Sequence, residues 1–194
     1  RAVRGGLHAP VIAILRADAR HVPLRDESVD CIVTSPPYWG LRRYEGGERQ
    51  IGLEATPAEY VETMLAVFRE AWRVLKLTGS LWLDLGDCYT SGGRKTRDPG
   101  QSKIHPAMEN WTAGRAKTPD GLKPKDLVGI PWRVAFALQA DGWWLREDIV
   151  WHKPVPMPES VKDRCTRAHE YIFHLTKAER YYHDADAIAE PFSE

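Results

Sequence analysis

The sequence has little cysteine, no surplus charge of either sign and no long apolar run. Its three cysteines, among 194 residues, are odd in number and widely spaced, which argues against a disulfide framework and against a zinc site. No apolar run approaches the roughly 18 residues of a membrane span, and the amino terminus lacks a signal-peptide pattern. We therefore expect a cytoplasmic protein that has no membrane segment and no bound metal.

The balance of charge limits what the chain can bind. Lysine and arginine total 27, aspartate and glutamate total 27, and the formal net charge is zero. A neutral chain has no global attraction for nucleic acid, so any contact with DNA must come from local patches. One such patch runs from Arg94 to Lys125, where eight basic residues stand against three acidic ones. It lies in a long segment without periodicity, at about residues 90–125, which is either an insertion that contacts phosphate or solvated disorder.

Alternating patterns predict an α/β fold. The apolar run Val29-Asp30-Cys31-Ile32-Val33 predicts a parallel strand buried on both faces. Thr56 as N-cap, Pro57 and Glu59 predict a helix with a capping box, which we expect to end at Gly79. A strand over residues 80–87 follows, and a strand, helix, strand unit of this length implies parallel pairing through a right-handed crossover.

The remaining elements extend this sheet at both ends of the chain. An apolar run over residues 11–15 predicts a buried strand that brings Asp18 to the ligand edge of the sheet, although Asp18 could equally be a helix cap or a solvated turn residue. A helix is expected over residues 130–139. Strands are expected over residues 145–151 and 169–175, and without a crossover helix between them they pair as an antiparallel hairpin.

The most distinctive stretch is the turn Thr34-Ser35-Pro36-Pro37-Tyr38-Trp39, directly after the first predicted strand. Its prolines lack N–H donors and fix their own φ, so the backbone leaves the sheet extended. The Ser35 hydroxyl, free carbonyls at Ser35 and Pro36, and the Tyr38 ring then gather at the carboxyl end of a strand, where open α/β sheets bind ligands. This arrangement predicts a socket for a flat ring that bears an amino group. The alternative is a proline-rich turn that merely ends a strand.

The Ser-Pro-Pro-Tyr turn resembles the catalytic motif of the amino-group DNA methyltransferases, which methylate an exocyclic amine of adenine (N6) or cytosine (N4) with S-adenosylmethionine. Five segments carry the resemblance in the order of the permuted class, in which the catalytic motif precedes the cofactor motif: Thr34 to Trp39, Gly79 to Asp87, Leu127 to Leu138, Gly142 to Pro158 and Tyr181 to Ile188. The resemblance implies a Rossmann-like methyltransferase fold, mostly parallel, with an antiparallel edge hairpin.

The resemblance also implies roles for individual residues. The expected catalytic residues are Ser35, Pro36, Pro37 and Tyr38, of which Tyr38 would stack on the target base. The expected cofactor-binding residues are Asp18, Thr34 and Ser35. The expected contacts with double-stranded DNA are Trp39, Arg42, Arg43, Arg94, Lys95, Arg97 and Lys153. A methyltransferase of a restriction-modification system fits this set, and a DNA-binding module without catalysis, either degenerate or one half of a split enzyme, is the alternative.

The family's cofactor motif, which ends in a glycine-rich turn, is absent between residues 1 and 194. In the permuted order this motif belongs downstream, so we expect the chain to be the amino-terminal, catalytic-motif portion of a methyltransferase domain. Without the strand that carries the motif, the Val29 to Val33 strand would be left at an edge of the sheet. An unpaired edge favours self-association or pairing with a complementing chain. Ser35, where many relatives have Asp, favours cytosine over adenine as the target.

Overall fold

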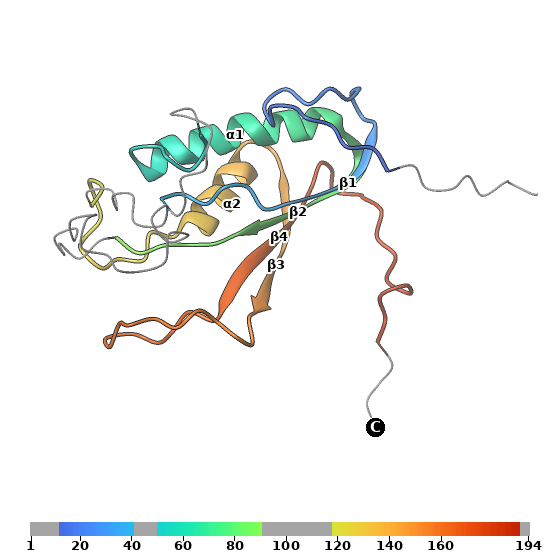
Figure 1. The fold of residues 1–194 in the computed structure, drawn as a ribbon. Helices are drawn as coiled ribbons and strands as arrows, with labels where there is room; N and C mark the ends of the chain where they lie inside the picture. Colours follow the sequence, from blue (N-terminus) through green and yellow to red (C-terminus); the bar gives the residue numbers. More distant parts are fainter. Residues whose placement is uncertain (1–11, 41–49, 91–117, 191–194) are drawn as a thin grey trace, which may run out of the picture.

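The computed structural model describes residues 12–40, 50–90 and 118–190. The expected DNA contacts Arg42, Arg43, Arg94, Lys95 and Arg97 lie outside these residues. Within the described ranges the chain forms, in order, β1 (Val29–Thr34), α1 (Pro57–Val74), β2 (Leu75–Leu85), α2 (Ile130–Ala140), β3 (Trp144–His152) and β4 (His169–Thr176) (Figure 1).

The four strands form one mixed sheet in the order β1-β2-β4-β3. β1 and β2 are parallel, whereas β4 runs antiparallel to both β2 and β3, so β3 points the same way as β2. The predicted α/β architecture with an antiparallel edge hairpin is therefore confirmed. As a consequence, β1, β2 and β3 all end at one edge of the sheet, together with the start of β4. In the part of the chain that the structure describes, no helix is long and apolar enough to cross a membrane.

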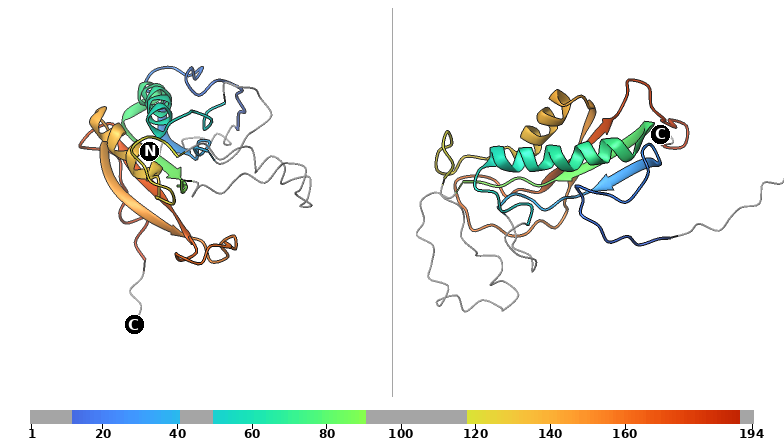
Figure 2. Two further views of the ribbon diagram at one scale, coloured as in Figure 1. Left: turned by 90° about the vertical axis from the view of Figure 1, so that its left-hand side faces the viewer. Right: turned by 90° about the horizontal axis from the view of Figure 1, so that it is seen from above.

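Both helices cover the same face of the sheet (Figures 1 and 2). Alternate residues of β2 point to this face, and Leu81, Leu83 and Leu85 are fully buried there. The residues between them, Trp82 and Asp84, point to the opposite face, because side chains alternate along a strand. The core consequently lies between the sheet and the two helices.

β1 differs from the expected strand in its burial. We expected a strand covered on both faces, but the Val33 side chain is 78% exposed and Cys31 is exposed as well. The reason is that β1 is an edge strand with β2 on one side, and no described helix covers the face to which Val33 points. The expectation that β1 would be left at an edge is confirmed within the described residues.

Helix α1 begins as predicted and ends earlier than predicted. The Thr56 hydroxyl accepts a hydrogen bond from the Glu59 backbone N–H, and the Glu59 carboxylate accepts one from the Thr56 N–H, which completes the capping box. The helix ends at Val74, and Gly79 lies inside β2 instead of closing the helix. A Cβ atom at Gly79 would lie 2.9 Å from the Asp30 carbonyl oxygen, so the glycine allows β1 and β2 to approach.

The strand expected over residues 11–15 is not formed, and this prediction is wrong for the described residues 12–15. Ile12 and Ile14 are 89% and 94% exposed, because an apolar run becomes a strand only when a neighbouring strand pairs with it. Asp18 instead lies in an exposed turn, where its carboxylate accepts hydrogen bonds from the Arg20 backbone and guanidinium.

The position of this turn removes Asp18 from the ligand edge. The backbone N–H of Val22 donates to Glu70, which lies ten residues after Tyr60, or roughly 15 Å along the axis of α1. Tyr60, in contrast, contacts the turn that follows β1, because its hydroxyl donates to the Pro37 carbonyl at 2.9 Å. Asp18 and Ser35 therefore lie toward opposite ends of α1.

Candidate active site

Hydrogen bonds fix the backbone of the turn that follows β1. The Tyr60 hydroxyl, on a fully buried side chain of α1, binds the Pro37 carbonyl at 2.9 Å. Beyond the turn, the backbone N–H of Gly40 donates to the Gly52 carbonyl at 2.8 Å. Gly52 has a φ of +95°, and a Cβ there would lie 2.8 Å from the Tyr38 carbonyl oxygen, so only glycine fits. Ser35 and Tyr38 are thus fixed at the carboxyl end of β1.

Trp39 belongs to this support and not to a DNA-binding surface. Its side chain is 6% exposed within the hydrophobic core, and its indole N–H donates to the Glu54 carbonyl at 2.9 Å. We had expected Trp39 to contact DNA, but its ring is enclosed and its only side-chain donor is used. The turn bends so that Trp39 faces the core while Ser35 remains exposed.

Tyr38 turns inward and meets two carboxylates. Its hydroxyl lies 3.2 Å from Asp84 Oδ2, at the end of β2, and 3.4 Å from Glu170 Oε2, at the start of β4. The Ser35 hydroxyl donates to the Tyr38 oxygen at 3.1 Å. The Tyr38 ring lies against Gly86, where a Cβ would come within 2.4 Å of a ring carbon. A larger residue than glycine at position 86 would therefore displace Tyr38.

Burial and negative charge shape the electrostatics of this cluster. Burial raises the pKa of Asp84, and the nearby Glu170 charge raises it further, against the opposing effects of the Tyr38 hydrogen bond and of Lys153. Burial, together with both carboxylates, also raises the pKa of Tyr38 above its usual range, so the phenol keeps its proton. Lys153 forms an ion pair with Glu170 Oε1 at 2.5 Å. Glu170 thus has a cationic partner.

A concavity of about 260 Å³ opens beside the cluster, on the sheet face opposite the helices. Its lining residues are Val33, Thr34, Ser35, Trp82, Asp84, Trp151 and Ile172. The apolar walls come from all four strands, and Ser35 and Asp84 supply polar atoms at the end of β1 and β2. Trp151 is 49% exposed, and the Lys153 ammonium lies 5.4 Å from the centre of its ring. Apolar walls with a few convergent polar groups are typical of a ligand site.

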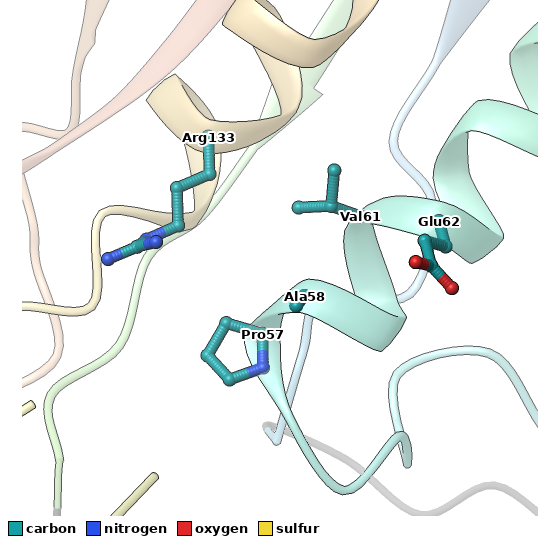
Figure 3. A pocket seen from close by; sticks show the side chains of 5 residues that line it. All are labelled: Pro57, Ala58, Val61, Glu62 and Arg133. Atoms are coloured by element: carbon teal, nitrogen blue, oxygen red, sulfur yellow. The ribbon is translucent and has the colours of Figure 1, made fainter. Parts of the chain in front are cut away.

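A second hollow, of about 380 Å³, lies between the start of α1 and α2 (Figure 3). Its lining residues are Pro57, Ala58, Val61, Glu62 and Arg133. The two charged side chains extend in different directions, and Arg133 Nε is already bonded to the Val128 carbonyl at 2.8 Å. This hollow therefore lacks the converging polar groups that distinguish the first. Within the described ranges, no three His, Cys, Asp or Glu side chains are grouped so that they could hold a metal ion.

The structure brings together some of the expected residues and adds others. Ser35, Tyr38 and Lys153 share one cluster, and Thr34 lines the concavity next to it. Asp84, Glu170, Trp151 and Gly86 were not predicted as site residues. Asp84 had a visible signal, because it is an acidic residue near the carboxyl end of a predicted strand. Glu170 had no such signal in the sequence, because it lies next to Tyr38 only as a result of the pairing of β4 with β2.

The fold and the site together define an α/β protein that carries Ser-Pro-Pro-Tyr after a parallel strand of a mixed sheet, beside a concavity with Ser35 and Asp84 at its edge. The chain matches the family model described as DNA methylase (N6_N4_Mtase) over residues 29–194. It therefore belongs to this family of DNA methylases.

Curated relatives support the assignment. The chain is 58% identical over 163 residues to the type II methyltransferase M.Cfr9I of Citrobacter freundii. This alignment covers 84% of this chain and 53% of the relative. It is 53% identical over 183 residues to the type II methyltransferase M.SmaI of Serratia marcescens, with 93% and 61% covered. The chain thus spans between half and two thirds of the length of these relatives.

Solved structures share the fold. The cytosine-N4-specific PvuII DNA methyltransferase matches with a TM-score of 0.55 at 19% identity, covering 86% of this chain and 48% of that one. A putative DNA modification methylase from Thermus thermophilus, solved in complex with S-adenosyl-L-methionine, matches with a TM-score of 0.56 at 21% identity, covering 86% and 54%. The sheet and its two helices are therefore part of a Rossmann-like methyltransferase fold.

Proposed function

We propose that this chain carries the base-binding, catalytic part of a DNA methyltransferase that transfers a methyl group from S-adenosylmethionine to an exocyclic amine, cytosine N4 or adenine N6. The observation that carries the proposal is the meeting of Ser35, Tyr38 and Asp84 beside an apolar concavity at the end of β1 and β2. Acceptor oxygens next to flat apolar walls suit an amino-bearing ring. Such a ring is reached only after it is flipped out of the DNA duplex.

The chemistry asked of these residues is positional. Ser35 Oγ and the Pro36 carbonyl accept hydrogen bonds from the exocyclic amine and draw its nitrogen lone pair out of conjugation with the ring. The bound cofactor supplies an electrophilic methyl group, and the turn aims the lone pair at it. Rate enhancement then comes from orientation and from fixed dipoles, without a covalent intermediate between enzyme and base.

The described residues fit part of a cofactor site. Thr34 and Ser35 line the concavity and supply hydroxyl and backbone groups at the edge where open α/β sheets bind ligands. Asp18, in contrast, is engaged by Arg20 toward the other end of α1, so we retain only Thr34 and Ser35 as proposed cofactor contacts in this arrangement. A complete cofactor site also requires the family's glycine-rich turn, which is absent between residues 1 and 194.

Contacts with duplex DNA are proposed for the basic residues near the site and in the segments beyond the described ranges. Lys153 lies at the carboxyl edge of the sheet, although its pairing with Glu170 uses part of its charge. Arg42, Arg43, Arg94, Lys95 and Arg97 remain proposed phosphate contacts on the basis of sequence. Because such contacts release counterions, binding that depends on them weakens steeply as salt rises.

The proposal is tested by methyl transfer to DNA. We expect the protein, at its full encoded length, to incorporate radiolabelled methyl groups from S-adenosylmethionine into duplex DNA, and nucleoside analysis to recover N4-methylcytosine. The cytosine preference rests on Ser35, because serine at this position is commoner in relatives that methylate cytosine N4, whereas aspartate is commoner in those that methylate adenine N6. Recovery of methylated adenine alone would reverse the base preference, and absence of any DNA methylation would refute the function.

The 194-residue chain alone is expected to bind S-adenosylmethionine too weakly for a saturable calorimetric signal below about millimolar cofactor. The sequence lacks the glycine-rich turn, and β1 lies at a sheet edge where a further strand could pair. For the same reason we propose that the chain associates with itself or with a complementing chain, which sedimentation would detect. A one-to-one isotherm of micromolar strength on a monomer would show that the cofactor site is complete within these residues.

A further inference from the structure

The hydrogen bonds around Tyr38 have a direction. The Ser35 hydroxyl donates its single proton to the Tyr38 oxygen at 3.1 Å. The Tyr38 hydroxyl donates its own single proton to a carboxylate, either Asp84 Oδ2 at 3.2 Å or Glu170 Oε2 at 3.4 Å. The Ser35 proton is therefore directed at the Tyr38 oxygen, and the Tyr38 proton at a carboxylate.

The two carboxylates are not equivalent. Glu170 is paired with Lys153 at 2.5 Å, which balances its charge. No lysine or arginine among residues 12–40, 50–90 and 118–190 forms an ion pair with Asp84, and Asp84 Oδ1 is buried without a hydrogen-bond partner. The Asp84 charge is thus the less compensated of the two, and it lies nearer the Tyr38 hydroxyl.

We propose that Asp84 is a positioning residue for methyl transfer, which acts through the Tyr38 hydroxyl to hold the Ser35 proton away from the target base. The inference rests on the proposed function, because it concerns how Ser35 meets the amine. A serine hydroxyl that is free to rotate can point its proton at the base, where it would repel an amine proton. With that proton committed to Tyr38, the lone pairs of Ser35 Oγ are left to accept from the amine.

The arrangement also strengthens Ser35 as an acceptor. Hydrogen bonds that end on a charged group are stronger than neutral ones, and bonds in a chain polarise one another in a medium of low dielectric. Negative charge on Asp84 is thereby felt at Ser35 Oγ through one intervening hydroxyl. The serine gains part of the acceptor strength that a carboxylate would have at the same position.

A pH dependence follows from this arrangement. Protonation of Asp84 would end its role as a charged acceptor, and burial together with Glu170 raises its pKa. The groups that face Asp84 are Tyr38 from the turn, Glu170 from β4 and Lys153 after β3. Because the ionised form is the active one, kcat is expected to fall as pH drops through the raised pKa. This acidic limb should disappear when the connecting hydroxyl is removed.

A double-mutant cycle on the full-length protein tests the relay. Tyr38→Phe removes only the hydroxyl, and Asp84→Asn removes the charge with little change in size. Each is expected to lower kcat about tenfold or more, with KM for DNA unchanged, because a hydrogen bond to a charged group is lost. In the Tyr38→Phe background, Asp84→Asn should cause little further loss, since the path from Asp84 to Ser35 is already cut.

The matched control is Asp30→Asn, which removes a carboxylate from an exposed ion pair with Lys76 on neighbouring strands and should leave kcat unchanged. An equal loss from Asp84→Asn in the presence and absence of the Tyr38 hydroxyl would overturn the relay. If Asp84→Asn fails to fold, the acidic limb of the kcat–pH profile is compared between the unmodified protein and Tyr38→Phe. An unaltered limb in Tyr38→Phe also overturns the relay. Absence of methyl transfer by the unmodified protein would instead refute the proposed function.

Discussion

Replacing Ser35 by alanine is expected to lower methyl transfer to DNA by about a hundredfold or more, while the free energy of unfolding changes by less than about 1 kcal/mol. The hydroxyl is the acceptor proposed to hold the reacting amine, so its loss acts on the transition state. Its contribution to the fold is small, because Ser35 is exposed and its one side-chain hydrogen bond is to Tyr38. Initial rates at saturating DNA and cofactor, together with urea denaturation, measure both quantities.

Ser28→Ala is the matched control for this experiment. Ser28 immediately precedes β1, is exposed and donates one hydrogen bond, to the Arg25 carbonyl at 2.7 Å. Ser28→Ala therefore removes a serine hydroxyl and one hydrogen bond, as Ser35→Ala does, but at the end of β1 away from the site. Full activity in Ser35→Ala, or an equal loss in Ser28→Ala, would contradict the assignment of Ser35.

Tyr38→Ala is a less clean test than the sequence suggested. Because Tyr38 lies on a turn after a strand, the sequence alone predicts that this substitution removes little packing. In the structure the ring is partly buried against Gly86, and its hydroxyl contacts two carboxylates. Truncation would leave a gap over the end of β2, so lost activity could not be separated from lost stability. Tyr38→Phe, which keeps the ring, avoids this ambiguity.

The second large effect is expected on stability. Asp87→Ala should lower the free energy of unfolding by about 3 kcal/mol or more, because the side chain is 2% exposed and caps α2. Asp87 Oδ1 accepts from the backbone N–H groups of Gly129 and Ile130, both at 3.0 Å. Asp87 Oδ2 also lies 3.7 Å from the guanidinium of Arg167, a side chain that is 13% exposed and would lose its ion-pair partner. Urea unfolding followed by tryptophan fluorescence measures the change.

Two further variants separate the cap from the charge. Asp87→Asn keeps one oxygen for the helix N–H groups and loses the charge beside Arg167. Its free energy of unfolding should therefore lie between those of the wild type and Asp87→Ala. Asp126→Ala removes a more exposed aspartate that also accepts from a backbone N–H, that of Lys123, and should cost about 1 kcal/mol. A loss below about 1 kcal/mol for Asp87→Ala would show that α2 does not depend on this cap.

Local rules were sufficient for much of the fold. The capping box at Thr56 located the start of α1, and the proline-rich turn located the end of β1. Both signals act over a few residues and depend little on the rest of the chain. The antiparallel hairpin was also predictable, since 169–175 followed 145–151 without a crossover helix, and the structure pairs β3 with β4 in this way.

What the sequence did not reveal depends on distant partners. The residue at the N-cap of α2 is Gly129, which has no side chain to cap the helix, and the cap comes from Asp87, 42 residues earlier. Glu170 reaches Tyr38 across 132 residues of sequence. The apolar run that begins at residue 11 failed for the same reason, because propensity cannot supply a neighbouring strand. Short-range patterns thus located the Ser-Pro-Pro-Tyr turn but not the carboxylates that surround it.

The junction between α1 and β2 determines where this chain can change in length. The helix ends at Val74 and the strand begins at Leu75 with no loop residue between them, but the first part of β2 is irregular, because Leu75 pairs with Val29 whereas Ser80 pairs with Cys31. One residue added after this irregularity, next to Ser80, would slip the end of β2 by one position. Since strand side chains alternate, such a slip would drive Asp84 beneath the helices and expose Leu83. A single residue inserted next to Ser80 should therefore abolish the site by inverting the end of the strand, even though no site residue has been altered.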